Sequence, residues 1–201
     1  MSVIGATSGK FVIAAAMLML HGRIDSVRAG IVIAPGQAQS RITPGHERAR
    51  VRIGIGADHI DVATPAAGPQ PGGHILTIGR DLLDTQAFVL DFPHHVVRLL
   101  TSGDARRREA RMTAVPVTTM ADGTLGVDLA IDDAPAATVP LDLASPAGVT
   151  APQGGDTATV RLGPATLSGV HPQPGPAAVG LRAFDRSVVI LDLAHRRIWV
   201  G

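Results

Sequence analysis

The sequence contains no cysteine, which excludes disulfide bonds, thiolate nucleophiles and zinc sites ligated by cysteine. Aromatic residues make up only 2% of the chain, so its core has to be filled by Val, Ile, Leu and Ala. Neither sign of charge is in excess, because 18 Lys and Arg residues stand against 17 Asp and Glu residues. Such a balance gives no field that would attract nucleic acid or an acidic membrane surface. We therefore expect neither as a partner.

Long apolar runs are also absent, since none reaches the ~18–20 residues that a membrane-spanning helix needs. The longest run is Phe11–Leu20, and it follows Lys10, the only lysine. No small-x-small cleavage site of a signal peptide follows promptly, so we expect a buried helix over Gly9–Leu20. The compartment, cytoplasmic or extracytoplasmic, stays open. The abundance of Ala, Gly and Pro, with Arg in place of Lys, is typical of a GC-rich bacterial genome.

What the chain does have is a globular composition rich in turn-forming residues. Its 201 residues suit one compact domain or two small lobes that share a core. Hydrophobic residues make up 45% and charged residues 17%, which separates the chain from disordered proteins. The 23 glycines and 15 prolines predict many turns and few, short helices. We therefore expect a mainly β protein.

The most informative feature is an internal repeat, in which Gly79–Leu100 aligns without a gap to Gly180–Gly201, 101 residues later. Further upstream, Val51–Gly54 matches Val160–Gly163. We therefore expect two copies, residues 1–100 and 112–201, joined by a charged linker at 101–111. The identical pairs in the closing segment are Gly79/Gly180, Asp84/Asp185, Leu90/Leu191, Asp91/Asp192 and His94/His195.

Apolar runs interrupted by short polar turns predict β-hairpins within each copy. A helix is expected only near Asp81–Asp84, besides the amino-terminal one. The expected hairpins are Phe88–Phe92 with Val96–Leu100, Leu125–Ile131 with Thr138–Leu141, and Val188–Leu193 with Arg197–Val200.

The closing part of each copy resembles a lobe of the retropepsin-like (pepsin-type) aspartic proteases. Such a lobe has a hairpin, an Asp-Thr-Gly loop, a variable region, a hydrophobic-hydrophobic-Gly motif, a short helix and a strand. Thr77-Ile78-Gly79-Arg80-Asp81 is similar to the closing motif of the family, and Ala178-Val179-Gly180 is its counterpart. The resemblance implies two β lobes of the acid-protease type, each a closed barrel. Glycine in this motif lets the backbone pass close beneath the catalytic loop.

The catalytic motif of the family is degenerate in the second copy. Thr138–Ser145 stands where hydrophobic-Asp-Thr-Gly-Ala-Ser belongs, so Asp142 takes the position of the catalytic aspartate. Leu143 replaces the Thr that ties the two catalytic loops together, and Ala144 replaces the Gly. The expected active-site loop residues of this copy are Asp142, Leu143, Ala144 and Ser145, with Val179 and Gly180 beneath them.

The best match in the first copy is Val3–Ser8, which places Val3 at the position of the other aspartate. The hairpin that should precede this loop is then missing from the first lobe. The expected loop residues of this copy are Ile4, Gly5 and Ala6, with Ile78 and Gly79 beneath them.

Aspartic proteases need two carboxylates about 3 Å apart that share one proton. With Asp142 alone, the resemblance implies a protein with little or no peptidase activity that binds extended peptides between its lobes. An active endopeptidase is the alternative, with the partner carboxylate supplied by missing amino-terminal sequence or by a second chain. We expect a monomer built as an internal pseudo-dimer, with a homodimer as the alternative.

Other motifs are weaker. Leu82–Ala87 resembles a catalytic loop around Asp84, but its place after the closing glycine favours a helix-end or turn residue. Gly5–Lys10 has the glycines of a phosphate-binding turn with the wrong spacing, so nucleotide binding is a minor alternative. His94, His95 and His195 lie at predicted turns, and adjacent strand histidines face opposite sides, so we expect no metal. No cofactor is expected.

Overall fold

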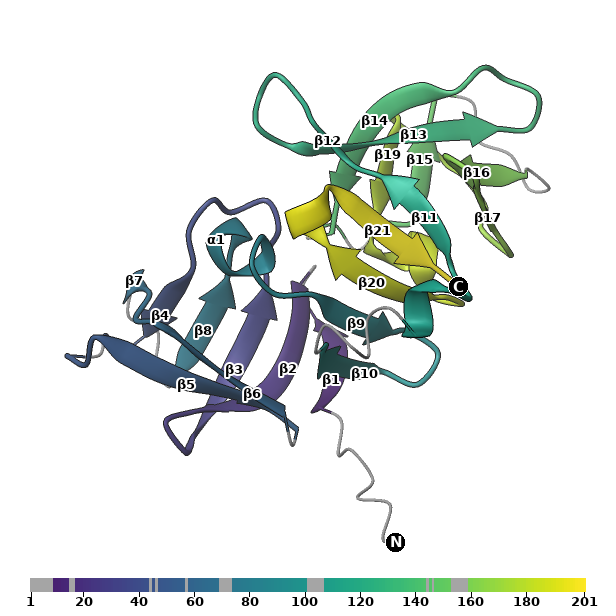
Figure 1. Ribbon diagram of the computed structural model, residues 1–201. Helices are drawn as coiled ribbons and strands as arrows, with labels where there is room; N and C mark the ends of the chain where they lie inside the picture. Colours follow the sequence, from purple (N-terminus) through teal and green to yellow (C-terminus); the bar gives the residue numbers. More distant parts are fainter. Residues whose placement is uncertain are drawn as a thin grey trace, which may run out of the picture.

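The protein is described by a computed structural model with two curled half-barrel sheets, which form a mainly β, two-lobed fold (Figure 1). This confirms the expected fold class. No helix in the described part of the chain is both long enough and apolar enough to cross a membrane. The structure describes residues 9–14, 17–43, 45, 47–56, 58–68, 74–100, 107–143, 145, 147–152 and 159–201.

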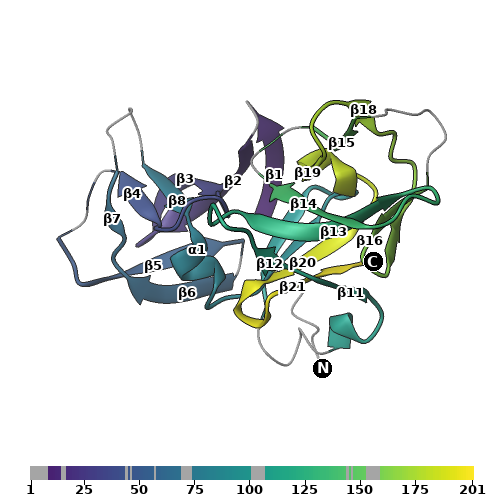
Figure 2. The ribbon, with the colours of Figure 1, turned by 90° about the horizontal axis from the view of Figure 1, so that it is seen from above.

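We use "first lobe" for the elements up to β10 and "second lobe" for those from β11 on. Seen from above, the two sets lie side by side, with β4 and β7 at one end and β16 and β18 at the other (Figure 2). The lobe boundaries at 100 and 112 stay a prediction. The first lobe comprises β1 (Gly9–Ala14), β2 (Met17–Ile24), β3 (Val27–Ile33), β4 (Arg41–Thr43), β5 (Arg50–Ile55), β6 (Asp58–Ala63), β7 (Ala66–Ala67), β8 (Ile75–Ile78), α1 (Arg80–Leu83), β9 (Phe88–Asp91) and β10 (Val96–Leu99).

The second lobe repeats this order of hairpins, with a 3₁₀ helix in the place of α1. Its elements are β11 (Thr113–Pro116), β12 (Thr118–Thr119), β13 (Leu125–Ile131), β14 (Ala137–Asp142), β15 (Val149–Ala151), β16 (Val160–Leu162), β17 (Ala165–Leu167), β18 (Gln173–Pro174), β19 (Ala178–Gly180), η1 (Leu181–Phe184), β20 (Val188–Asp192), η2 (Leu193–His195) and β21 (Arg197–Val200). The three predicted hairpins are confirmed as β9–β10, β13–β14 and β20–β21.

The expected helix over Gly9–Leu20 is wrong, because this segment forms strands β1 and β2. The two strands pair with each other in antiparallel register, from Phe11 opposite Leu20 to Ala14 opposite Met17. On its other side β1 pairs with β10. A strand paired on both sides reads as a continuous apolar run, which periodicity alone does not distinguish from a buried helix.

Alternation of exposed and buried residues fixes the faces of the strands. In β5, Arg50 and Arg52 point to solvent, while Val51, Ile53 and Ile55 are at most 1% exposed. This period of two is what one buried sheet face requires. Most buried residues of both lobes form one continuous core, and the rings of Phe92 and Phe184 meet within it, with centroids 6.2 Å apart. Val89, Leu100 and Ile190 form a second, smaller cluster.

The two lobes are joined by antiparallel pairing of β9 with β20. Val89 stands opposite Ile190, and these two residues occupy the same position of the sequence repeat. Phe88 stands opposite Leu191 and Leu90 opposite Val189. The offset of 101 exchanges these two pairs, because Phe88 corresponds to Val189 and Leu90 to Leu191. The join therefore has the register of a two-fold symmetric contact centred on Val89 and Ile190.

Candidate functional site

The loop of the second lobe begins where β14 ends, at Asp142. The backbone N–H of Ser145 donates to the carbonyl of Asp142 at 3.0 Å, which closes a tight turn. Asp142 is exposed and Leu143 is only 3% exposed. The turn therefore presents a carboxylate outward and an apolar side chain inward.

Gly180 lies directly beneath this loop, as the sequence predicts. Strand β19 runs parallel to β14, with Gly180 opposite Asp142. The N–H of Leu181 donates to the carbonyl of Ser145 at 2.9 Å. A Cβ atom on Gly180 would lie 2.4 Å from the carbonyl oxygen of Ala147, a distance that no side chain tolerates. Glycine is needed here for close approach of two backbones.

The first lobe contains a loop with the same hydrogen bonds, and it begins at Ala34. Strand β8 runs parallel to β3, with Ile78 opposite Ile33. The N–H of Gln37 donates to the carbonyl of Ala34 at 2.9 Å, and the N–H of Arg80 donates to Gln37 at 2.8 Å. A Cβ atom on Gly79 would lie 2.6 Å from the carbonyl carbon of Gln39.

Each of these contacts has its counterpart in the second lobe. Ala34 and Asp142 stand 108 residues apart, as do Gln37 and Ser145, and Gln39 and Ala147. In Figure 1 the arrowheads of β3 and β14, where the two loops begin, both point toward the middle of the molecule. Ala34, 8% exposed, therefore occupies the position in the first lobe that Asp142 occupies in the second.

This arrangement corrects the predicted loop of the first lobe. The predicted residues Val3, Ile4, Gly5 and Ala6 lie outside the described residues, and the place above Gly79 is taken by the chain from Ala34 to Gln39. The expectation that the first hairpin is missing is also wrong, because β2 and β3 form it.

One sequence signal could have located the loop. Ile31-Val32-Ile33 is an apolar run followed by Ala34-Pro35-Gly36, so the glycine of the family motif stands at its expected distance from the strand. The segment Ala34–Gln39 contains no aspartate, so the family motif is hard to see in it.

The predicted match of Val51 with Val160 is two residues out of register. Ile53 pairs with Ile24 as Val160 pairs with Ile131, so Ile53 is the counterpart of Val160.

Position by position, the two loops carry different side chains. Ala34 stands where Asp142 stands in the second loop, so the two positions hold one carboxylate between them. Pro35 and Leu143 follow them, and both are buried. Gly36 keeps the motif glycine, and Ala144 lies outside the described residues.

The two loops are held down by different chemistry. In the first lobe the buried hydroxyl of Ser40 accepts from the N–H of Gly79 at 2.8 Å and donates to Asp81 at 2.6 Å. In the second lobe the N–H of Gly180 donates to the backbone carbonyl of Gly148 at 2.7 Å instead. The N–H of the glycine beneath the first loop is therefore held by a side chain that Asp81 of α1 fixes in turn, and that beneath the second loop by a backbone carbonyl.

Asp84 is not part of the site. It caps the carboxyl end of α1, as Asp185 caps that of η1, which confirms their interpretation as helix-end residues. The matched histidines lie at turns, where Nδ1 of His94 is 2.8 Å from Asp91 and Nδ1 of His195 is 2.7 Å from Asp192. Within the described ranges no three His, Asp or Glu side chains group as metal ligands would.

Among the described residues, the nucleotide-binding alternative lacks the helix that it requires after Lys10. Gly9 and Lys10 of its motif belong to β1, opposite Val97 and Val96, and β1 is followed by β2. A phosphate-binding turn needs the amino terminus of a helix directly after it. Residues 5–8 of the motif lie outside the described part of the chain.

A groove of about 730 Å³ opens beside the first loop. Loop residues Gln37–Gln39 form one side of it, and Arg41 and Thr43 of β4 continue it toward the edge of the sheet, where β7 is the last strand. Ile75, Thr77 and Gly68 complete the lining. The groove therefore combines amide, hydroxyl and guanidinium groups with an apolar lining to which Ala38 and Ile75 contribute.

No family model matches the sequence, and no curated protein matches it. Two crystal structures of seed proteins are similar to the fold. Basic 7S globulin from soybean gives a TM-score of 0.60 at 10% sequence identity, over 97% of this chain and 94% of that one. Conglutin gamma, a basic 7S globulin from lupine seeds, gives 0.57 at 9% identity, over 97% and 94%.

The likeness shows the fold alone. That fold is the two-lobed β fold of these two globulins. The resemblance to aspartic proteases rests on the closing motifs of the sequence.

Proposed function

We propose that this protein is a retropepsin-like protein without peptidase activity that binds extended peptide segments beside its two loops. The absence of peptidase activity is inferred from Ala34, which stands where a second catalytic aspartate would be needed. A lone Asp142 cannot hold the shared proton that lets one carboxylate activate water while the other protonates the carbonyl. Its enzymatic class, if any activity remained, would be that of an aspartic endopeptidase.

The matched hydrogen bonds around Gly79 and Gly180 support an origin of the two lobes as copies of one unit. In this proposal the loops keep their shape because the backbone contacts beneath them are retained. Their chemistry is lost at three positions of the motif, where Ala34, Pro35 and Leu143 replace reactive or hydrogen-bonding side chains.

The groove beside the first loop supports the second half of the proposal. Its polar groups suit a peptide backbone, which needs a donor or acceptor for each of its own groups, and its apolar part suits side chains. Because β7, the neighbour of β4, is the last strand of its sheet, a segment bound there could extend the sheet by strand addition.

Peptidase activity is tested with unfolded casein and a mixed peptide library between pH 2 and pH 7, with the wild type and Asp142→Asn. We expect no cleavage by either protein and no effect of pepstatin. Pepstatin-sensitive cleavage that Asp142→Asn abolishes would overturn the proposal. If that cleavage rose with the square of protein concentration, the second carboxylate would come from a second chain.

Peptide binding is tested on an array of unstructured peptides. Thr77→Trp places a large ring in the groove, and Thr166→Trp adds the same ring at an exposed position of β17 in the second lobe. We expect Thr77→Trp to remove binding that the wild type and Thr166→Trp share. Equal binding by all three proteins would contradict the location, and no bound peptide would contradict the function.

A further inference from the structure

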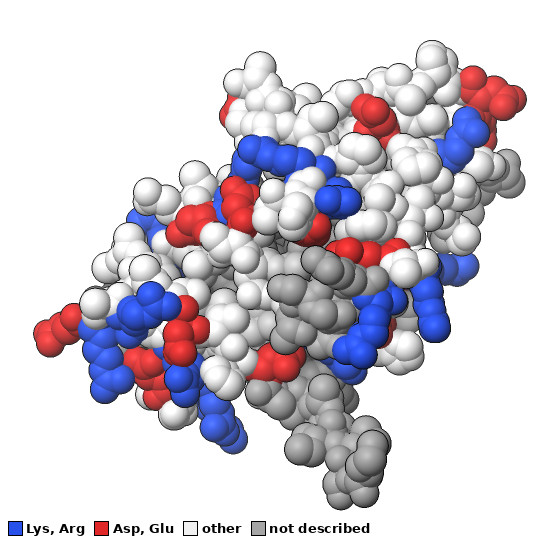
Figure 3. All heavy atoms as spheres, viewed as in Figure 1, with Lys and Arg blue, Asp and Glu red and all other residues white. Residues whose placement is uncertain are grey.

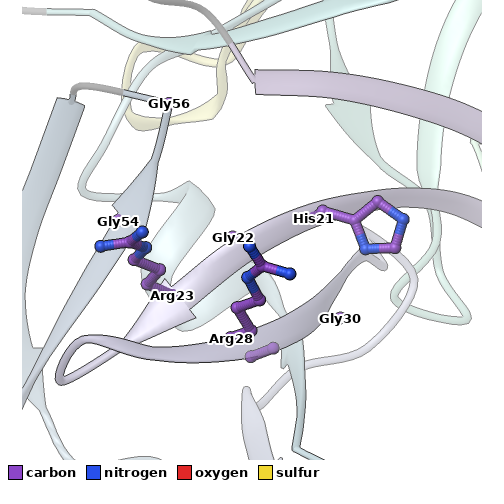
Figure 4. Close-up of a pocket in the computed structure, with 8 residues that line it drawn as sticks. His21, Gly22, Arg23, Arg28, Gly30, Gly54 and Gly56 are labelled. Atoms are coloured by element: carbon purple, nitrogen blue, oxygen red, sulfur yellow. The ribbon is translucent and has the colours of Figure 1, made fainter.

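The hairpin of β2 and β3 carries a basic pocket that lies apart from the two loops. Arg23 of β2 stands directly opposite Arg28 of β3, and His21 stands opposite Gly30. Residues paired in this way project from the same face of a sheet. Together with Gly54 and Gly56 they line a pocket of about 630 Å³, and Figure 4 shows both guanidinium groups projecting from one side of the hairpin.

Two arginines in directly opposite positions repel each other. Among the described residues, neither Arg23 nor Arg28 has a carboxylate within ion-pair distance. The two nearby carboxylates are taken: Asp25 accepts from the N–H of Arg52 and pairs with Arg48, and Asp61 pairs with Arg52. The hydrogen bond and charge of Arg52 lower the pKa of Asp61. The repulsion between Arg23 and Arg28 is therefore not relieved by the protein itself.

This pair differs from the arginines in and just before β5. Figure 3 shows blue and red side chains intermixed over β5 and β6, where Arg48 and Arg52 have their partners. Two like charges without carboxylate partners are expected at a site where an anion from outside the protein supplies the opposite charge.

Glycines leave the space around the arginines open. Gly54 stands opposite Arg23, and Gly30 opposite His21, so neither neighbour projects a side chain over the pocket. Packing does not demand glycine at these two positions, because an added Cβ would come no closer than 3.7 Å to other atoms at Gly54 and 4.0 Å at Gly30. Gly22, on the opposite face, is different, since its Cβ would lie 2.3 Å from Ile31.

We propose that this pocket binds the phosphate group of a larger phosphorylated ligand. A phosphate monoester carries up to two negative charges and three terminal oxygens, which match two guanidinium forks that each prefer a pair of oxygens. The pocket exceeds the size of phosphate alone and lies in the range of ligand sites, so the remaining space would hold the group that carries the phosphate. This inference does not depend on the function proposed for the loops.

The test measures binding of inorganic phosphate, glucose 6-phosphate and a phosphoserine tetrapeptide by calorimetry, at constant ionic strength. The proteins are the wild type, Arg23→Gln, Arg28→Gln, the double variant and a control with Arg108→Gln and Arg111→Gln. The control removes the same charge at two exposed positions outside the pocket. Sulfate-free chloride buffer and the unphosphorylated tetrapeptide serve as blanks.

We expect inorganic phosphate to bind weakly and one of the two larger ligands to bind more tightly, which would also distinguish a phosphopeptide from a sugar phosphate. Each single substitution should weaken binding about tenfold or more, because a charge-assisted hydrogen-bond pair is lost. The control should bind like the wild type.

Absence of saturable binding by all three phosphorylated ligands would overturn the proposal, as would equal weakening in the pocket and control variants. Melting temperature provides a second readout that does not need tight binding. Phosphate should raise it in the wild type and the control and leave it unchanged in the double variant. An equal rise in all three would show general screening of charge and would also overturn the site.

Discussion

Gly79 and Gly180 show at single-residue scale why the closing motif of each lobe can be found in the sequence. Each lies beneath a loop at a distance that only a hydrogen in place of Cβ allows. Gly36, within the first loop itself, has no atom within 4 Å of the place its Cβ would take. The same amino acid is therefore required beneath the loop and dispensable in it.

Gly180→Ala is expected to destabilise the protein by about 1–3 kcal/mol, the usual cost of forcing a methyl group into a packed site. The clash is with backbone atoms of Ala147, which cannot move aside as a flexible side chain would. Gly36→Ala is the matched control, and we expect a change below about 0.5 kcal/mol. Urea unfolding followed by circular dichroism measures both, and equal losses would contradict the close approach beneath the loop.

At the scale of elements, the β2–β3 hairpin carries strain in its turn. Asp25 and Ser26 both have positive φ, at 48° and 77°, as a two-residue turn of type I′ requires. The carboxylate of Asp25 compensates by accepting from the N–H of Arg52 at 2.8 Å. No such bond is recorded for the side chain of Ser26, which makes it the residue to replace.

Ser26→Gly should stabilise the protein by about 0.5–1 kcal/mol. Relief of the left-handed conformation contributes about 1–2 kcal/mol, and the greater freedom of glycine in the unfolded chain takes back about 0.5–1 kcal/mol. Ser26→Ala keeps the Cβ and should bring no gain. Both are measured as shifts of the urea midpoint at constant slope, and a gain shared by the two variants would show that removal of the hydroxyl, not of the strain, is responsible.

The elements that could be predicted are those that carry their own turn and strand signals. The hairpins β9–β10, β13–β14 and β20–β21 and the short helix before Asp84 follow from β-branched runs and from the residues between them. β1 and β2 could not be recognised, because an interior strand and a buried helix are equally apolar. Ala34 is marked in the sequence only by the apolar run Ile31–Ile33 before it and by Gly36 after it, since the loop it begins has no reactive side chain of its own and is defined by contacts with Gly79.

At the scale of the whole molecule, one core runs through both lobes, and β9 pairs with β20 across the junction. The ring of Phe92 from the first lobe lies against that of Phe184 from the second. Such continuity predicts that the two lobes unfold in one cooperative transition.

Leu76→Ala tests this expectation, because Leu76 is fully buried in β8 of the first lobe. The substitution should cost about 2–5 kcal/mol. Trp199, the only tryptophan, reports on β21 of the second lobe. We expect its fluorescence transition and the circular-dichroism transition to move together to lower urea. A tryptophan transition that stays in place while circular dichroism shows two steps would reveal lobes that unfold separately.

The contact between β9 and β20 pairs Val89 with its own counterpart Ile190. The same edge of the equivalent strand in each lobe therefore forms the contact. Assembly of the halves thus depends on backbone hydrogen bonds and aliphatic side chains well removed in sequence from Ala34 and Asp142. A carboxylate at the head of one loop can give way to a methyl group while the halves still dock in the same register. A fold of this kind keeps its shape whichever side chain stands at the start of each loop.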